Sequence, residues 1–403
     1  MSSRVRITLI STSCFIIFYV VLGGLLGNNS DDSKDSAYKY LGVYSEVVSR
    51  INSDYVTEPD LRKVTGGAIR GLLEALDPYS TYMTPEEYKA YQQHPEPGPA
   101  NVGIFVAKRL GFATIVSLLP GSPAEKAGVK IGDLIDRVDN LGTRELSVVQ
   151  IQRMLAGEPG TAVELTVVRE ARGDPQKISV IRATPANPPV IAKMVDSAAG
   201  YVRVSLFSKG TANQVATQLK QLTSSGADKF VLDLRNCAGG ESEEAVEVAG
   251  LFVEKGLLGY LQGQRFPRQD LVAKPRSFQT SLPLAVLINQ STAGPAELVA
   301  SSVAGNKRGD VLGSRSFGIG VYQKVISLDD GSALLLSVAK YYGPDGKAIQ
   351  DNGVTPTVTE ELPPDSSASE DEELAAPENF GDSSDRLLRK AIQVLDQKTP
   401  KAA

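Results

Sequence analysis

Hydrophobic residues near the start of the chain form one long uncharged run and then recur at the spacing of amphipathic helices. The run occupies residues 7–27 and, as a helix, would span roughly 31 Å, about the thickness of a membrane core. After a polar spacer, apolar residues fall three and four positions apart through residues 41–51 and again through 61–76. Thr84 and Glu87 then form a capping box that opens another short helix. The pattern predicts a small helical module after the run.

From about residue 98 the pattern changes to short runs of β-branched and apolar residues, which predict strands. Such runs occupy residues 104–106, 114–116, 163–168 and 178–182. The segment 120–128 reads Pro-Gly-Ser-Pro-Ala-Glu-Lys-Ala-Gly, in which Ser122 caps a short helix and Gly128 ends it. A second helix is predicted around residues 149–155.

The second half of the chain alternates strands with helices. Apolar runs predict strands at residues 201–206, 229–234 and 285–288, and helical spacing predicts helices at residues 211–222, 243–252 and 296–303. Alternation of this kind indicates a sheet covered by helices. Apolar positions from Leu387 to Leu395 predict one more amphipathic helix, capped by Ser384.

Composition narrows the class of protein. The 403 residues are 42% hydrophobic and 22% charged, as in globular proteins, and this length indicates two or three domains. Ten of the 47 acidic residues lie between Glu360 and Asp385, where Lys and Arg are absent, so the other 37 stand against 42 basic residues elsewhere. Neither the charge of the whole chain nor that of the part outside residues 360–385 is basic enough for the dense basic face of a nucleic-acid binder. The acidic stretch 362–383, which also contains Pro and Ser, is predicted to be a disordered loop.

Cysteine and histidine are too scarce for several kinds of site. Cys14 lies inside the apolar run, far from Cys237, so the two cysteines form no disulfide framework. His94 is the one histidine, which argues against a histidine-based zinc site and against a Ser-His-Asp triad. Any hydrolytic chemistry would need a different base.

The N-terminal charges predict the direction of insertion. Arg4 and Arg6 precede the apolar run, and positive charge on that side keeps the N-terminus in the cytoplasm and the remainder outside. Residues 1–27 are therefore predicted to be an inner-membrane anchor. A cleaved signal peptide is the alternative, but no clear Ala-x-Ala cleavage site follows the run. Both interpretations place the rest of the chain in the periplasm or cell envelope.

Residues 96–185 resemble a PDZ domain in the order of their strands and helices. The sequence Gly-Ser-Pro-Ala-Glu-Lys-Ala-Gly, followed by Gly-Asp, is a specific match. PDZ domains bind a peptide as an added strand at a sheet edge and hold its terminal carboxylate with loop N–H groups. By that resemblance, the capture loop consists of Val102, Gly103, Ile104 and Phe105. The alternative is that these residues only begin a strand of a half-barrel.

Three further blocks resemble the carboxyl-terminal processing peptidases, also called tail-specific proteases. They are Leu-Asp-Pro-Tyr-Ser-Thr-Tyr at 76–82, Leu-Asp-Leu-Arg-Asn at 232–236 with a Gly-Gly turn, and Tyr-Tyr-Gly-Pro-Asp-Gly at 341–346. The resemblance covers the chain from about residue 40 to its end. It implies an α/β core outside the cytoplasm, an inserted PDZ domain that recruits substrate tails, and cleavage by a Ser–Lys dyad with no metal and no cofactor. A lysine that burial makes neutral can deprotonate a serine, so such a dyad suits a chain poor in histidine.

The catalytic blocks of that family are in frame here but lack the reactive residues. The family pattern Asn-x-x-Ser-Ala-Ser-Ala-Ser-Glu corresponds to residues 289–297, which puts Gly294 at the nucleophile position. The pattern Phe-Gly-Lys-Gly, four residues before a glutamine, puts Ile319 at the position of the general base and keeps Gln323. Glycine has no group to attack a carbonyl, and isoleucine cannot accept a proton.

The resemblance also implies an oxyanion hole with two N–H donors. One comes from the turn at Gly239 or Gly240, and the other from the residue after the nucleophile. That residue is Pro295, which has no N–H. Loss of one such donor typically lowers the rate roughly 10²–10³-fold. Because nucleophile, base and one donor are all missing, the sequence predicts a pseudo-protease.

Two relocated nucleophiles remain as alternatives. Ser291 or Thr292 with Lys324 would form a new dyad, although Lys324 is adjacent to Gln323 on a presumed strand and should point to its other face. Cys237, beside the turn, is the other candidate. A buried cysteine is usually inert, and no histidine is available nearby to activate this one.

The predicted fold is α+β and multidomain. Its parts are an anchor at 1–27, a helical domain at 28–95, a PDZ domain (a β-rich half-barrel with two helices) at 96–185, an α/β peptidase-like core at 186–361, the acidic loop at 362–383 and a C-terminal helix at 384–403. The predicted function is to bind polypeptide C-termini as an adaptor, scaffold or regulator of an active peptidase relative. An active serine endopeptidase with a relocated nucleophile is the alternative. A third hypothesis leaves the groove unused and assigns the helices to a homo-oligomer. The membrane is an expected partner, and nucleic acid is not.

Overall fold

The computed structural model describes residues 32–93, 98–109, 111–169, 174–184, 187–196, 198–359 and 380–398. The chain divides into two compact units, residues 1–68 and residues 69–403. The predicted anchor at 1–27 and most of the predicted acidic loop at 362–383 lie outside the described residues. Within the described ranges, no helix combines the length and the apolar character that a membrane crossing requires.

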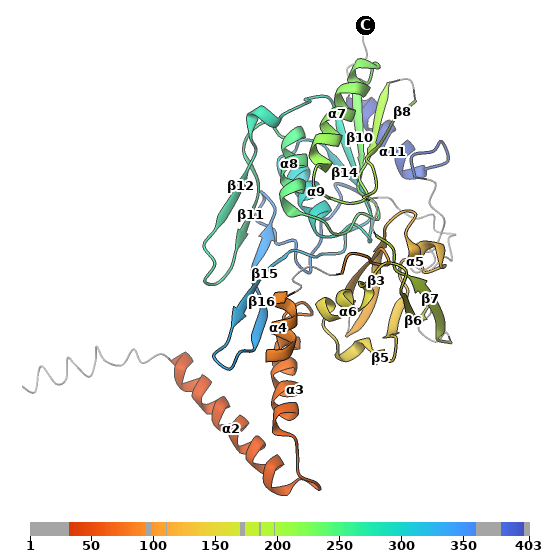
Figure 1. The fold of residues 1–403 in the computed structure, drawn as a ribbon. Helices are drawn as coiled ribbons and strands as arrows, with labels where there is room; N and C mark the ends of the chain where they lie inside the picture. The colour runs from red at the N-terminus through yellow and green to blue at the C-terminus, as the bar shows by residue number, and fades with distance from the viewer. Residues whose placement is uncertain are drawn as a thin grey trace, which may run out of the picture. The chain divides into compact units, whose positions relative to one another are not determined.

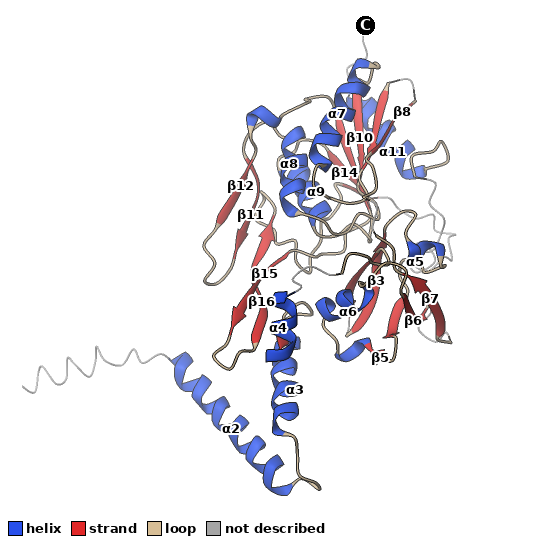
Figure 2. Ribbon diagram, viewed as in Figure 1, coloured by secondary structure: helices blue, strands red, loops and turns tan. Residues whose placement is uncertain are grey.

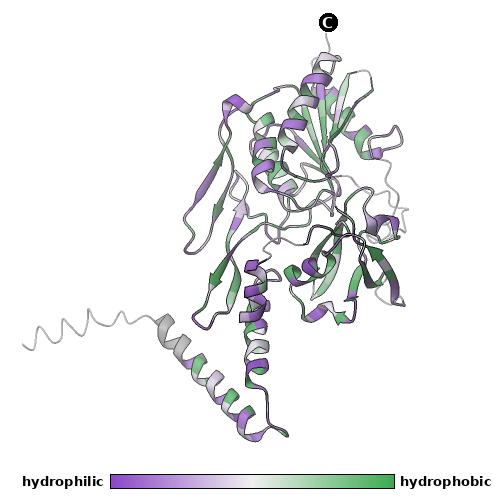
Figure 3. Cartoon of the chain, viewed as in Figure 1, coloured by the Kyte–Doolittle hydropathy of each residue, from purple (hydrophilic) through white to green (hydrophobic). Residues whose placement is uncertain are grey.

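The first unit contains helix α2 (Asp32–Asp54) and the beginning of helix α3 (Leu61–Glu74). The helical spacing predicted here is confirmed. Tyr44, Val48 and Ile51 share one side of α2 and are partly shielded from solvent, while most of the positions between them are exposed. Figure 3 shows the resulting alternation of hydrophobic and hydrophilic bands along α2.

Helix α4 (Pro85–Gln93) begins at the predicted capping box. The N–H of Glu87 donates to Thr84 Oγ1 at 3.2 Å, and the Thr84 N–H donates to Glu87 Oε2 at 2.8 Å. Both groups would otherwise be unpaired donors at the start of the helix.

Residues 98–184 form a small β-rich domain around its own apolar core. Its main strands, in their order across the sheet, are β2 (Ile104–Arg109), β3 (Phe112–Leu118), β4 (Leu134–Val138), β6 (Ala162–Val168) and β7 (Gln176–Ile181), with the short strand β5 (Leu141–Gly142) beside β4. Two helices, α5 (Pro123–Lys126) and α6 (Val148–Leu155), complete the half-barrel that the sequence predicts. Among the described strands, β2 is the outermost one of this sheet, and no other described strand pairs with its outer edge.

The core of the second unit is a six-stranded sheet. Its order is β17 (Val358–Thr359), β14 (Asp310–Gly313), β13 (Leu284–Ile288), β10 (Lys229–Asp233), β9 (Ala199–Arg203) and β8 (Ile191–Val195). All neighbours are parallel except β8 and β9. Figure 2 shows helices on both faces of this sheet, as the alternating pattern predicts.

Successive residues of the central strands point to opposite faces, and both faces are buried. Phe230 and Leu232 pack toward helices α7 (Thr211–Ser224), α8 (Ser242–Phe252) and α9 (Pro295–Gly305). Val231 packs toward helix α11 (Arg386–Lys398) on the other face. Burial on both faces explains why these strands are continuous apolar runs (Figure 3).

A second, antiparallel sheet flanks this core, and the hydrophobic pattern predicts little of it. Its strands are β1 (Thr81–Met83), β16 (Ala333–Tyr342), β11 (Leu257–Gln262) and β12 (Gln269–Val272), with β15 (Val321–Ser327) also paired to β16. Apart from the strand presumed around Gln323, the sequence offers no clear signal, because β15 is largely exposed and lacks a regular alternation of apolar and polar residues. In Figure 1, β11 and β12 form the long paired ribbon beside α8, and β15 and β16 form the paired ribbon below it.

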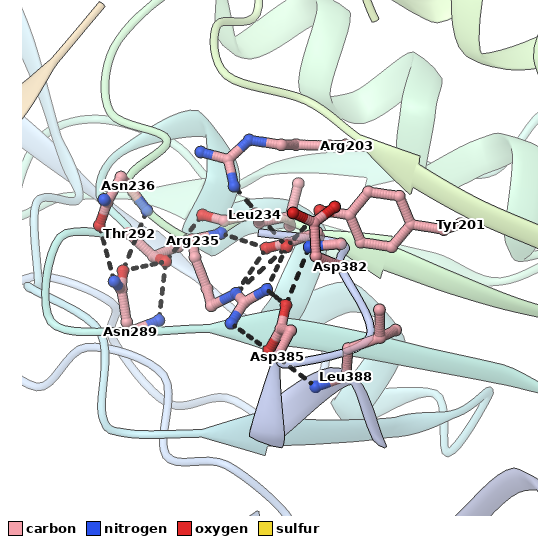
Figure 4. Close-up of polar contacts among 12 residues, drawn as sticks. Tyr201, Arg203, Leu234, Arg235, Asn236, Asn289, Thr292, Asp382, Asp385 and Leu388 are labelled. Atoms are coloured by element: carbon pink, nitrogen blue, oxygen red, sulfur yellow. Dashed lines mark hydrogen bonds and ion pairs between the residues drawn. The ribbon is translucent and has the colours of Figure 1, made fainter. Parts of the chain in front are cut away.

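A buried ion cluster joins the end of β10 to the start of α11 (Figure 4). The Arg235 guanidinium donates to the Asp233 carboxylate at 2.6 Å and to the Asp385 carboxylate at 2.5 Å. It also lies 4.4 Å from the centre of the Phe380 ring. Burial alone would raise the pKa of Asp233, but the charge and hydrogen bonds of Arg235 outweigh that effect and hold the pKa below its usual value. The cluster fixes the C-terminal helix to the sheet.

The predicted cap of α11 is wrong by one residue. The helix begins at Arg386, and the N–H of Leu388 donates to Asp385 Oδ1 at 3.1 Å, so Asp385 caps the helix in place of Ser384. Both residue types are good caps, and the buried partner Arg235 selects the aspartate.

We predict that Asp385→Ala lowers the free energy of unfolding of the core by about 3–5 kcal/mol, because it leaves the buried Arg235 guanidinium without one of its two carboxylates. Asp385→Asn should cost less, since asparagine also caps helices. Asp382→Ala is the control, because its pair with Lys193 is exposed; it should change stability by no more than about 1 kcal/mol. Denaturant titration measures all three, and equal losses for Asp385→Ala and Asp382→Ala would contradict the assignment.

Candidate functional site

The candidate site lies where helix α9 begins, beside the turn that follows strand β10. Ala293 and Ala238 form a parallel bridge, and the Ala293 N–H donates to the Cys237 carbonyl at 2.9 Å. Gly294 is the N-cap of α9, with φ 60° and ψ −120°, a conformation that glycine adopts readily and other residues do not. A Cβ at this position would have no heavy atom nearer than the Gly239 nitrogen, 4.0 Å away. The nucleophile position therefore faces the Gly-Gly turn, and a side chain has room there.

One buried carboxylate ties the two predicted catalytic positions together. Glu297 Oε2 accepts the N–H of Gly294 at 2.9 Å and the N–H of Ile319 at 2.8 Å. Its other oxygen accepts the N–H of Gly318 at 2.7 Å and the hydroxyl of Ser316 at 2.5 Å. Burial raises the pKa of the Glu297 carboxyl to about 7, and the four donors oppose that rise. Glu297 thus holds the backbone at both positions in one arrangement.

The side chain at the base position lies in apolar surroundings. Ile319 packs in a small cluster with Ala238 and Ala293 of the core and with Ala107 and Val116 of the β-rich domain. The side chains around Ile319 are therefore apolar, as its own side chain is. A charged ammonium at this point would be costly.

The turn predicted to supply the oxyanion donors is covered by the predicted peptide-binding loop. Gly239 and Gly240 have φ of 84° and 101°, which favour glycine. A Cβ at Gly239 would lie 2.1 Å from an atom of the Phe105 ring, so that ring rests directly on the turn. The Ser117 hydroxyl of the β-rich domain also donates to the Asn236 carbonyl beside the turn. The structure thus brings the two predicted sites together.

Within the predicted capture loop, the side chains serve the fold. Val102 is fully buried in the core of the β-rich domain, and Ile104 packs against the same core. Gly103 has φ 77°, and a Cβ there would lie 2.3 Å from the Cβ of Ser122. Its N–H donates to Asn101 Oδ1 at 2.9 Å. Any capture of a carboxylate at this loop must therefore use backbone groups, and the N–H of Gly103 is available only if Asn101 releases it.

A cavity of about 220 Å³ lies between Phe105 of the loop and the predicted catalytic positions. On the side of the β-rich domain it is lined by residues of β2, β3 and α6, and on the core side by the predicted site residues Gly239, Gly294, Pro295, Ile319 and Gln323. The Gln323 side chain also donates to the Tyr79 carbonyl at 2.9 Å, which fixes its amide beside the cavity. Of the predicted capture loop only Phe105 lines the cavity; Val102, Gly103 and Ile104 do not, and neither does Gly240.

Neither relocated nucleophile has a suitable setting among the described residues. The Thr292 hydroxyl is buried and donates to the Leu234 carbonyl at 2.8 Å, and Ser291 is almost fully buried. Lys324 is exposed, with its ammonium 5.1 Å from the centre of the Phe266 ring. It lines a different hollow, of about 940 Å³.

Cys237 is buried next to the turn. Burial raises the pKa of its thiol well above the usual range, which disfavours the reactive thiolate.

Two features of the site were not predicted from the sequence: the role of Glu297 and the part that helix α6 plays in lining the cavity. In the sequence Glu297 serves only to fix the alignment, although a glutamate three residues after an N-cap can accept the N-cap N–H with its carboxylate. The helix around 149–155 is predicted from the sequence. That its residues Val148, Val149 and Gln152 line the cavity becomes visible only in the three-dimensional structure.

Three family models match parts of this chain. They are Peptidase family S41 over residues 198–360, the PDZ domain over 114–169 and the activating protease CtpB N-terminal domain over 26–87. Along the chain they follow the predicted order of helical domain, PDZ domain and peptidase core. The resemblance seen in the sequence is therefore confirmed for the α+β multidomain fold.

Whole-length similarity agrees with these models. Carboxy-terminal processing protease CtpA of Bacillus subtilis (strain 168) is 32% identical over 364 residues, which cover 89% of this chain and 76% of that protein. The carboxy-terminal-processing protease of Bartonella bacilliformis is 31% identical over 339 residues, covering 82% of this chain and 77% of that protein. Among solved structures, the photosystem II D1 C-terminal processing protease superposes with a TM-score of 0.66 at 27% identity, covering 79% of this chain and 92% of that chain.

We predict that Glu297 gives the core a pH-dependent stability. Its carboxyl has a pKa of about 7 in the folded chain and an ordinary value of 4.5, so the folded chain binds the proton more tightly than the unfolded chain does. Stability from this group should therefore fall as the pH rises from about 4.5 to about 7, by about 3 kcal/mol in all.

Glu297→Gln removes this titration. The advantage of the wild type over Glu297→Gln in the free energy of unfolding should shrink by about 3 kcal/mol between pH 4.5 and pH 7 and stay constant outside that window. Denaturant titrations at four or more pH values measure it. A difference between the two proteins that is the same at every pH would contradict the prediction.

Proposed function

Because this chain belongs to the family of carboxyl-terminal processing proteases, we propose that it binds polypeptide C-termini through its PDZ domain and does not hydrolyse them. The observation that carries this proposal is the pair of residues held by Glu297. Gly294 and Ile319 occupy the positions of nucleophile and base, and neither side chain can do that chemistry. The proposed role is that of an adaptor, scaffold or regulator of an active peptidase relative.

A missing oxyanion donor supports the same proposal. Pro295 is the first residue of helix α9, where proline fits well but offers no N–H to a developing oxyanion. Only the turn at Gly239 and Gly240 would remain, and the Phe105 ring rests on it. Peptide binding, in contrast, needs only an open strand edge and backbone donors, and the outer edge of β2 provides the first.

Hydrolysis is the second candidate, because the two relatives compared above are both named as proteases. It requires a nucleophile elsewhere, either Ser291 or Thr292 with Lys324, or Cys237. Their burial, their hydrogen bonds and the separate hollow of Lys324 weigh against both. Location is part of the proposal as well: Arg4, Arg6 and the apolar run support a periplasmic or cell-envelope protein held by an inner-membrane anchor.

We predict that the wild type cleaves an unstructured fluorogenic tail no faster than a no-enzyme control. Gly294→Ser with Ile319→Lys should also stay near background, because Pro295 still removes one oxyanion donor. Adding Pro295→Ala should give the first measurable rate. Peptide release followed by mass spectrometry reports each protein.

Cleavage by the wild type above the control would overturn the non-hydrolytic proposal. Replacing Ser291, Thr292 and Cys237 by alanine, one at a time, would then identify the nucleophile. A robust rate in the double variant would show instead that the second oxyanion donor is dispensable.

We also predict that a labelled ten-residue tail with a free C-terminus binds at least tenfold more tightly than its C-terminal amide. Backbone N–H groups of the loop can hold a carboxylate, and amidation removes its charge. Fluorescence anisotropy with the full chain measures both. Equal affinities would show that the Val102–Phe105 loop captures no carboxylate, while leaving strand addition intact.

A further inference from the structure

A second cavity, of about 230 Å³, lies between helix α3, strand β1 and the β-rich domain. Arg70 and Glu74 of α3 contribute to its lining, as do Lys108 of β2 and Ser147, the N-cap of α6. It shares no described lining residue with the cavity beside Gly294, so it is separate from the candidate functional site. The function proposed above makes no use of its two basic side chains.

Lys108 is a buried cation without a close counterion. Its side chain is 6% exposed, and its ammonium donates to the Arg144 carbonyl at 2.7 Å. The Glu74 carboxylate is 3.9 Å away, which is beyond hydrogen-bond distance. Burial lowers the pKa of Lys108, and the charge of Glu74 opposes that effect without cancelling it. A further anion close to the ammonium would replace the hydration that burial removes.

Arg70 also has hydrogen-bond donors to spare. Its Nε is buried and has no acceptor among the described residues. Its Nη2 lies 3.7 Å from Glu87 Oε2, so this ion pair is loose. Both oxygens of that carboxylate are already engaged, since Oε2 accepts the Thr84 N–H and Oε1 accepts the Gln150 side chain. Glu87 therefore does not satisfy the guanidinium.

The two acidic residues that line the cavity do not satisfy these cations either. Asp77 Oδ1 accepts the N–H groups of Tyr79 and Ser80 at 2.8 and 2.6 Å, and its Oδ2 accepts the Ser80 hydroxyl at 2.8 Å. Its carboxylate is thus occupied by neutral donors of the neighbouring turn. The side chain of Glu74 is 59% exposed, so its charge is largely hydrated and can turn toward solvent.

We infer that this cavity is a binding site for a doubly charged oxyanion of the size of phosphate, held by Arg70 and Lys108. Guanidinium and ammonium groups bind phosphate oxygens through charge-assisted hydrogen bonds. Thr81 and Ser147 also line the cavity, and hydroxyl groups can donate to the same anion. The volume is several times the ~30 Å³ that one water occupies in the liquid, so the anion and some water fit. The inference depends neither on tail binding nor on catalysis.

The test titrates the full chain with inorganic phosphate in a calorimeter at about pH 7.5, where phosphate carries close to two charges. Sodium chloride keeps the ionic strength constant. Phosphate should bind with a dissociation constant below about 1 mM, and acetate roughly tenfold more weakly, because two cations attract a double charge more strongly. Glycerol 3-phosphate is the second probe. Tighter binding than that of inorganic phosphate assigns the site to the phosphate of a larger molecule, and weaker binding assigns it to the free ion.

Lys108→Met and Arg70→Gln should each weaken phosphate binding roughly tenfold or more, because each removes one of the two charges. Lys177→Met is the matched control. It removes a lysine charge from the same domain, but this side chain is 69% exposed, pairs with Glu164 and does not line the cavity. It should change the dissociation constant less than about twofold.

Glu74→Gln removes the carboxylate beside Lys108 and should tighten phosphate binding roughly threefold. Because Glu74 is largely exposed, this variant keeps the test decisive if Lys108→Met does not fold, which circular dichroism reports. Three results would overturn the inference: no phosphate binding up to about 10 mM, equal affinities for phosphate and acetate, or affinities of the Lys108, Arg70 and Glu74 variants that match the wild type. Each of them leaves the proposed tail binding untouched.

Discussion

The geometry of the site depends on a single buried carboxylate. Glu297 accepts hydrogen bonds from the N–H groups of Gly294, Gly318 and Ile319 and from the Ser316 hydroxyl, so it joins the start of helix α9 to the segment that leads into β15. These bonds involve backbone groups at the two catalytic positions and do not depend on which side chains stand there. The backbone at Gly294 and Ile319 can therefore keep its arrangement whichever side chains stand at these two positions.

The residues at those two positions also suit a stable fold better than catalytic residues would. At φ 60° and ψ −120°, a serine would carry a backbone strain of about 1–3 kcal/mol that Gly294 avoids. Ile319 packs against the apolar cluster that contains Val116 and Ala293, where a lysine would have to lose its hydration. Active sites often retain such costs for the sake of reactivity. The non-hydrolytic function proposed above requires no such costs at these two positions.

The sequence predicts most of the core because its signals are local and strong. Strand β10 is a continuous apolar run and the helix at 211–224 has regular spacing, and both lie within a few residues of their predicted positions. The antiparallel sheet is harder to predict, because β15 is exposed and is held by pairing with β16, a long-range interaction. The cap of α11 differs by one residue for a related reason: the preference for Asp385 arises from Arg235, 150 residues away.

In the candidate site, too, local features can be predicted from the sequence and long-range contacts cannot. The missing groups at Gly294, Pro295 and Ile319 can be recognised from the sequence alone, since a motif in frame shows which atoms are absent. The contact of Phe105 with Gly239 cannot, because it joins two domains whose surfaces the sequence does not bring together. That contact places the predicted peptide-binding strand directly beside Gly294 and Ile319. Because the strand predicted to bind peptides rests on the turn predicted to hold the oxyanion, a change of side chain at Ile319 alters the lining of the cavity beside both of these predicted sites.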